Sequence, residues 1–373
     1  MDALRALAAL SVLASHVLLV DLGARVPGIF GALGSGVTIF FVISGFLLYR
    51  PFVAARAGGP PAPPLMAYLR RRAVRIFPAY WLALTVLSIY PGGLSGTFSR
   101  HTPVFYSLLQ YWFPHLRTQG LPQAWSLSVE ITWYGLLAVM ALASSATMVR
   151  RSERPAGSWL RREILLLVLL ACIRLAYQPL SGGAFDALLA YLDWFLGGMA
   201  LAVASVAVAG RRPPQAIRLV ERYGSTCWVV AFAVYCTFAF RLDHQSPTFV
   251  NHLEQGLFAI LVVMPAVFAG EGRGLVRSVL RNRVLIWLGV VSYGIYLWHV
   301  PIVLALAKAR WITTLHGGRL AVLAASTLAI TICCAAASYY LLERPLLRQD
   351  RRRAAGGRAT TRSPLADTWV APD

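Results

Sequence analysis

Apolar segments long enough to cross a lipid bilayer follow one another along most of this chain. Hydrophobic residues make up 58% of the 373 residues and charged residues only 13%, about half the charged fraction of a soluble domain. A hydrocarbon core about 30 Å thick requires roughly 20 mainly apolar residues for each helical crossing. The candidate segments are 3–20, 29–49, 76–90, 125–147, 163–178, 185–209, 225–241, 253–270, 285–306 and 320–342. The pattern predicts an all-α, polytopic membrane helix bundle.

The distribution of basic residues predicts how this bundle is oriented. If the N-terminus is cytoplasmic and every segment crosses, the cytoplasmic loops and tail hold 26 basic residues and the outer loops hold seven. Membrane proteins retain Lys and Arg in their cytoplasmic loops. The bias therefore predicts about ten transmembrane helices in the cell (plasma) membrane, with both termini cytoplasmic.

The same distribution bears on domains and partners. Apolar segments continue to residue 342, so we expect one transmembrane domain over 1–348 and a basic, disordered cytoplasmic tail over 349–373. The net charge of +20 is typical of nucleic-acid-binding proteins. Here the charge lies between apolar segments, so we expect contact with membrane lipids and no nucleic acid.

Two further features are expected to be structural. Residues 106–113 are apolar but too short to cross the membrane, which favours a re-entrant or interfacial helix. The five cysteines lie inside apolar segments without metal-ligand spacing, so we expect small buried hydrophobic residues and no metal site.

Ionisable residues inside membrane segments are costly, and each is a candidate functional residue. Arg5 and His16 are eleven residues apart, about three helical turns, so they share one face of the first segment. Glu130 has no basic neighbour within a turn and requires a partner from another helix or a proton. A carboxylate next to an imidazole creates a general base, so a His16–Glu130 pair is one possibility. A snorkelling Arg5, a His16 bonded to a backbone carbonyl and an interfacial Glu130 are the alternatives.

Three other polar groups have competing interpretations. Arg72 and Arg75, at i and i+3, share a helix face and suit the phosphates of coenzyme A, although a positive-inside signal is the more common reason for such a pair. Asp193 precedes Gly197 and Gly198, where helices can approach closely, and a structural hydrogen bond explains it equally well. The aromatic residues and His299 in 293–299 are expected to be interfacial belt residues.

Six segments, taken in order, resemble motifs of the acyltransferase 3 family of membrane acyltransferases. This family modifies bacterial polysaccharides and macrolides. The six segments are 2–16, 36–47, 72–81, 125–130, 292–301 and 343–345. The chain departs from the family pattern at Thr38, where Asp is common, and at 131–133, where Glu-Gln-Phe is frequent.

The resemblance implies roles for particular residues. His16 is the expected catalytic base, with Glu130 supporting the site. Arg5, Arg72 and Arg75 are expected near the donor. The resemblance also implies acyl-CoA as a co-substrate, with no permanently bound cofactor.

The acceptor is expected to be a hydroxylated carbohydrate, either a cell-envelope glycan or a glycosylated natural product, and an acetyl group is favoured. The Arg-rich composition and the lack of an esterase-like C-terminal domain tilt the choice slightly towards the natural product. The alternative function is a small-molecule or proton-coupled transporter that uses His16, Glu130 and Asp193 as a relay.

Overall fold

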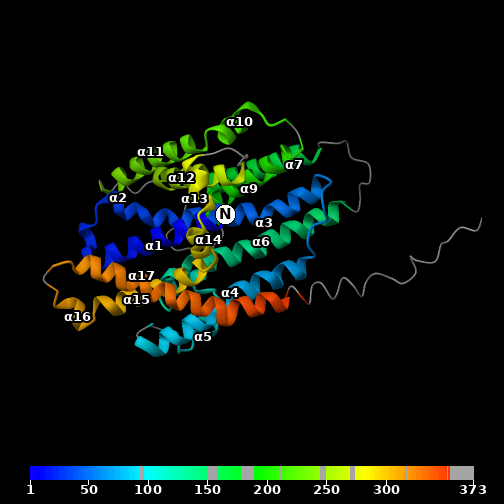
Figure 1. Ribbon diagram of the computed structural model, residues 1–373. Coiled ribbons are helices and arrows are strands. Elements are labelled where there is room, and N and C mark those ends of the chain that lie inside the picture. The colour runs from blue at the N-terminus through cyan, green and yellow to red at the C-terminus, as the bar shows by residue number, and fades with distance from the viewer. Residues whose placement is uncertain are drawn as a thin grey trace, which may run out of the picture.

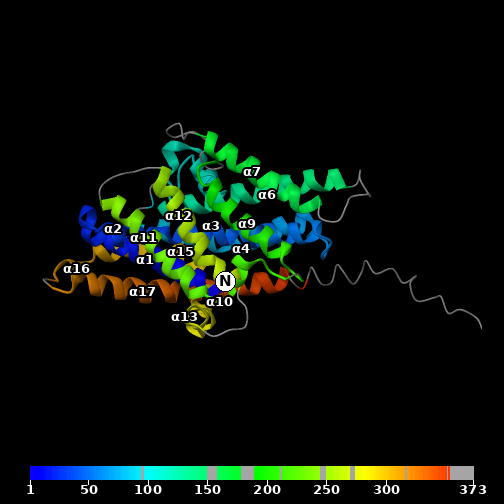
Figure 2. The ribbon, with the colours of Figure 1, turned by 90° about the horizontal axis from the view of Figure 1, so that it is seen from above.

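The computed structural model of this protein is an elongated bundle of long helices that run side by side (Figure 1; Figure 2). It describes residues 1–92, 94, 96–148, 158–177, 189–210, 212–243, 249–268, 274–315, 317–350 and 352. The regular secondary structure of these residues is helical throughout, with no strand. The predicted all-α class is therefore confirmed for the described part of the chain. Almost all of the predicted tail, 349–373, lies outside it.

Within the described residues, eleven helices build the body of the bundle. They are α1 (Asp2–Leu22), α3 (Gly36–Arg56), α4 (Leu65–Leu87), α6 (Trp125–Met148), α7 (Ser158–Ala176), α9 (Leu192–Ala207), α11 (Gly224–Asp243), α12 (Phe249–Val267), α14 (Arg283–Val290), α15 (Ser292–Ala307) and α17 (Arg319–Ser338). Five short helices connect them: α2 (Gly28–Gly31), α5 (Thr102–Tyr106), α10 (Gln215–Arg222), α13 (Leu275–Arg281) and α16 (Arg310–Thr313).

Six helical stretches of the described chain are long and apolar enough to cross a membrane. They are Asp2–Arg25, Gly28–Arg56, Leu65–Tyr90, Gly224–Leu242, Phe249–Val267 and Arg319–Asp350. Helices α14 and α15, which meet at a 70° bend, make a seventh if they are counted as one broken span. Each of the ten predicted segments contains helical residues. The count of ten crossings and the orientation stay predictions.

Two predicted boundaries differ from the observed ones. Helix α4 begins at Leu65, directly after Pro64, rather than at 76. Arg72 and Arg75 therefore lie within the helix, which agrees with the helix face predicted from their spacing. Segment 106–113 is not one helix. Helix α5 ends at Tyr106, and a single 3-10 turn follows at Gln110–Trp112. Hydrogen bonds from Tyr80 to Phe105 O (2.7 Å) and from Trp81 to Tyr106 O (2.8 Å) hold this segment against α4.

Small residues set the closest helix contacts around α3. A Cβ atom on Gly198 of α9 would lie 2.1 Å from Val42 O, and one on Gly36 would lie 2.4 Å from Ala8 O. These distances bring the backbones of α9 and α1 directly against α3. The predicted close approach at Gly198 is therefore confirmed, and α3 is fixed between two helices, one of which carries Arg5 and His16.

Candidate active site

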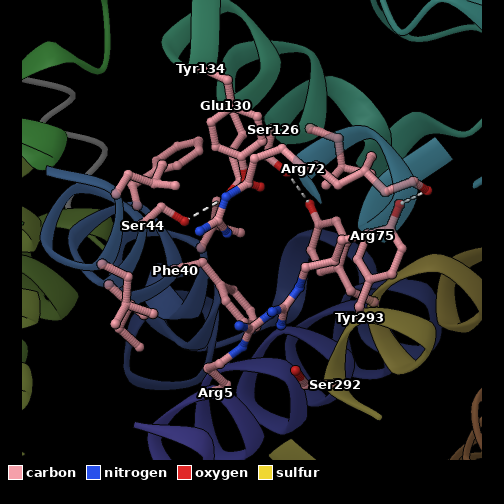
Figure 3. Close-up of a pocket in the computed structure, with 18 residues that line it drawn as sticks. Arg5, Phe40, Ser44, Arg72, Arg75, Ser126, Glu130, Tyr134, Ser292 and Tyr293 are labelled. Carbon is pink, nitrogen blue, oxygen red and sulfur yellow. Dashed lines mark hydrogen bonds between the residues drawn. The ribbon is translucent and has the colours of Figure 1, made fainter. Parts of the chain in front are cut away.

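A polar cavity lies between α1, α3, α4, α6 and α15. Its polar and charged lining includes Arg5, Ser44, Arg72, Arg75, Glu130 and Tyr134 (Figure 3). Arg5 approaches from the opposite side to Glu130 and Tyr134. The volume is about 70 Å³, enough for a few water molecules. A longer substrate chain can enter this space only if lining side chains move apart.

Helical periodicity explains why these charged side chains converge. Arg72 and Arg75 are one turn apart on α4, so both point to the same side of that helix. Glu130 lies in the second turn of α6, and Arg5 lies near the start of α1. The predicted donor-binding residues and Glu130 therefore meet in one cavity.

Glu130 is held by two hydroxyl groups. Ser44 of α3 donates a hydrogen bond of 2.5 Å to Oε1, and Tyr134, one turn along α6, donates one of 2.6 Å to the same oxygen. The partner that Glu130 requires from another helix is therefore Ser44. Both contacts are to Oε1.

The three guanidinium groups have no carboxylate partner within 4 Å among the described residues. Arg5 Nε is buried and makes no hydrogen bond there. Arg72 lies over the rings of Tyr68 and Tyr134, 5.8 Å from each centroid. Three fixed cations with free donors suit a phosphate or another anion.

His16 lies further along α1, about 16 Å from Arg5 for eleven helical residues, and does not line the cavity. Its Nδ1 is 2.9 Å from Val12 O and 3.3 Å from His299 Nε2 on α15. No hydrogen bond joins His16 to Glu130 in the described chain. The pairing considered from the sequence is thus replaced by a His16–His299 pair. The predicted bond from His16 to a backbone carbonyl is confirmed.

Tyr296 borders both the cavity and His299. It lines the cavity, and its ring centroid is 5.7 Å from that of His299. Its hydroxyl donates to Gln123 O (2.7 Å), so it accepts the 2.7 Å hydrogen bond from Ser126 Oγ. The hydroxyl end of this ring is therefore held in place, and the ring forms part of the cavity lining next to His299.

Two other candidates lie apart from the cavity lining. Asp193 accepts hydrogen bonds from Arg174 Nε (3.1 Å) and His252 Nε2 (3.0 Å), which gives it the structural partners considered from the sequence. Glu343 is buried and 3.3 Å from Ser338 Oγ. It interacts electrostatically with Arg75 and Arg5, while the neighbouring Arg344 lies over Tyr340.

Sequence reasoning missed one residue that the structure places next to His16. His299 was expected to belong to an interfacial belt, yet it is 1% exposed. A signal for it was present. A histidine on a predicted membrane helix that carries no Asp, Glu, Lys or Arg requires a polar partner.

Taken together, the apolar helices and the internal polar cavity define a multi-pass membrane protein with an enclosed site. A family model described as an acyltransferase domain matches residues 1–338. The chain belongs to this family of acyltransferases, and the resemblance to the acyltransferase 3 family is confirmed. It is therefore an enzyme that transfers acyl groups other than aminoacyl groups. Membership of this family also sets the transporter alternative aside.

Three curated relatives are similar to this chain. The exopolysaccharide production protein ExoZ of Rhizobium meliloti is 31% identical over 292 residues, which cover 74% of this chain and 78% of the relative. The peptidoglycan O-acetyltransferase OatA of Listeria monocytogenes is 25% identical over 88% of this chain and 53% of its own length. The putative peptidoglycan O-acetyltransferase YrhL of Bacillus subtilis is 25% identical over 81% and 48%, respectively. The chain thus spans about half of the last two, and no solved structure matches it significantly.

Proposed function

We propose that this enzyme transfers an acyl group, with acetyl favoured, from cytoplasmic acyl-CoA to a carbohydrate hydroxyl. The observation that carries the donor assignment is the convergence of Arg5, Arg72 and Arg75 on one cavity. Coenzyme A brings several phosphate charges, and guanidinium groups bind phosphates through paired hydrogen bonds. Arg72 and Arg75 would hold the phosphates at the cytoplasmic side.

The orientation proposed from the basic loops suits this arrangement. With both termini cytoplasmic and ten crossings, Arg5 lies on the cytoplasmic side of α1 and His16 lies about 16 Å deeper. The pantetheine arm, roughly one leaflet long, would carry the thioester from the arginines towards His16. The displacement of side chains such as Tyr296, which the small cavity requires, would open this route.

The chemistry proposed at His16 is general-base catalysis. His16 Nε2 takes the proton of the acceptor hydroxyl, and the oxygen attacks the thioester carbonyl carbon. A C–O bond forms as the C–S bond breaks, and the leaving thiolate takes the proton back from His16 to give free CoA. The products are the acyl ester and the thiol. Glu130, fixed by Ser44 and Tyr134, would moderate the attraction between the donor-site arginines and the phosphates of the donor.

The names of the relatives favour a polysaccharide acceptor. One is an exopolysaccharide production protein and two are peptidoglycan O-acetyltransferases, one of them putative. A cell-envelope glycan is thus the better supported class, ahead of the natural-product glycoside that composition alone favoured.

The decisive experiment measures thioester cleavage by the purified protein in nanodiscs. Acetyl-CoA and longer acyl-CoAs are supplied with glycan acceptors, and release of free CoA is followed for wild type and His16→Ala. We expect release by wild type and loss of about 100-fold or more in the variant. Equal rates in both would exclude His16 as the base. Failure of wild type to bind any acyl-CoA, measured by calorimetry, would exclude the donor.

A further inference from the structure

His299 is buried within α15, and its hydrogen bonds define which ring nitrogen carries the proton. Its Nδ1 is 2.9 Å from Tyr296 O and 3.1 Å from Ile295 O. Carbonyl oxygens only accept hydrogen bonds, so Nδ1 is the donor. A neutral His299 therefore presents the lone pair of Nε2.

That lone pair faces His16. His299 Nε2 is 3.3 Å from His16 Nδ1, and the two rings meet edge to face with centroids 5.0 Å apart. His16 Nδ1 is also 2.9 Å from Val12 O, so it too is a donor. One N–H group is thus shared between a backbone oxygen and the imidazole of His299.

The consequence for His16 concerns its other nitrogen. With the proton on Nδ1, the lone pair of His16 is on Nε2. Within the residues that the structure describes, Nε2 makes no hydrogen bond, and it is not among the buried polar atoms without a partner. It is therefore open to a reacting group, and a base requires such a free lone pair.

As the hydrogen-bond acceptor for His16, a neutral histidine costs less to bury than a carboxylate. A buried carboxylate would have to be desolvated within the apolar bundle, at a cost of several kcal/mol. Neutral His299 accepts the same N–H group without a net charge. When His16 gains a second proton, the N–H becomes a stronger donor, and His299 Nε2 is already in place to share it.

We propose that His299 is the positioning residue of His16. It accepts the Nδ1–H group, holds the ring in one tautomer with Nε2 free, and stabilises the imidazolium that forms when His16 takes a proton. This inference rests on the proposed role of His16 as the base, and it assigns His299 no contact with either substrate.

Three substitutions test the proposal by acyl transfer in nanodiscs. His299→Leu removes the acceptor, and we expect kcat to fall about 100-fold while the donor KM stays within twofold. His299→Gln places an amide oxygen near the position of Nε2, and we expect kcat within about tenfold of wild type. The matched control is Trp298→Phe on the same helix. It removes a buried Nε1 that makes no hydrogen bond in the described chain, and kcat should not change.

A spectroscopic measurement separates positioning from a merely structural role. ¹⁵N spectra of histidine-labelled protein, assigned with His16→Gln and His299→Gln, should show His16 protonated at Nδ1 and correlated through the hydrogen bond with Nε2 of His299. Protonation of His16 at Nε2 instead would overturn the proposal, and so would wild-type kcat in a folded His299→Leu variant.

The outcomes also distinguish the proposed role of His16 as the base from the proposed role of His299 as its positioning residue. Full activity in His16→Ala would overturn the proposed function and this inference with it. Loss of activity in His16→Ala together with full activity in His299→Leu would overturn the role of His299 alone. Thermal unfolding of each variant in the same nanodiscs identifies any variant that fails to fold. If a variant does not fold, the ¹⁵N spectrum of the wild-type protein decides whether His299 holds His16 in the proposed tautomer.

Discussion

Ser44 on α3 donates a 2.5 Å hydrogen bond to Glu130 on α6, across 86 positions of sequence. This bond fixes a carboxylate in a cavity that also contains three arginines. The carboxylate opposes any anion that the arginines attract. The effect of this carboxylate on anion affinity can be measured directly.

Glu130→Gln should bind coenzyme A more tightly than wild type. The amide retains an oxygen for Ser44 and Tyr134 but removes one negative charge from the cavity. For unit charges about 10 Å apart the effect is roughly 1–2 kcal/mol, or about tenfold in Kd, and it should shrink as salt is added. Calorimetry measures Kd, and Ser44→Ala, which keeps the charge, is the control. Weaker binding by Glu130→Gln would mean that the carboxylate positions the arginines instead of opposing the anion.

Arg72→Gln and Arg75→Gln should each raise the KM for acetyl-CoA by about ten- to 100-fold, because each removes a charged hydrogen-bond donor to phosphate. With acetyl-pantetheine, a thioester without these phosphates, the same variants should match wild type. Arg71→Gln is the control, since Arg71 is exposed beside the pair and does not line the cavity. An equal penalty with both donors would argue against phosphate recognition.

Gly198→Ala should destabilise the protein. Its Cβ would lie 2.1 Å from Val42 O, so α9 and α3 would have to separate, and overpacking of this kind typically costs 1–3 kcal/mol or more. We expect the unfolding temperature in detergent to fall by several °C. Gly135→Ala provides the comparison, because a Cβ there meets nothing within 4 Å and alanine favours the helix. Similar behaviour of the two variants would contradict the close contact.

The orientation predicts which loops react from outside the cell. In a variant whose five cysteines are replaced, Gly317→Cys should be labelled by a membrane-impermeant maleimide on intact cells. Ala216→Cys, at the start of α10 in a segment rich in arginine, should react only after permeabilisation. Both positions are exposed. The reverse labelling pattern would invert the topology and place the arginine-lined cavity on the outer side.

Local periodicity was enough to predict part of the site. The i, i+3 spacing of Arg72 and Arg75 predicted a shared face, and both line the cavity. The eleven-residue spacing of Arg5 and His16 likewise predicted one face of α1. In the structure Arg5 lies with Ser292 in the cavity lining and His16 lies against His299, so both face α15.

The remaining features depend on which helices pack together. His16 and His299 are separated by 283 positions, and no local pattern specifies that α1 lies against α15. The partner of Glu130 could not be deduced for the same reason, because Ser44 is one of many small polar residues in apolar segments. The start of α4 was missed because the residues just before 76 include four arginines and do not form an apolar segment, although they belong to the same helix.

Tyr296 has a consequence for the membrane as well as for the reaction. Polar groups that run without interruption through a bilayer can conduct protons and dissipate the electrochemical gradient. In this protein the ring of Tyr296, anchored to Ser126 and Gln123, lines the arginine-lined cavity and also lies 5.7 Å, between ring centroids, from the ring of His299. Its apolar ring is thus positioned to interrupt a path of polar groups from the cavity to His299. If the ring moves aside when an acyl group passes, its return would close this path again.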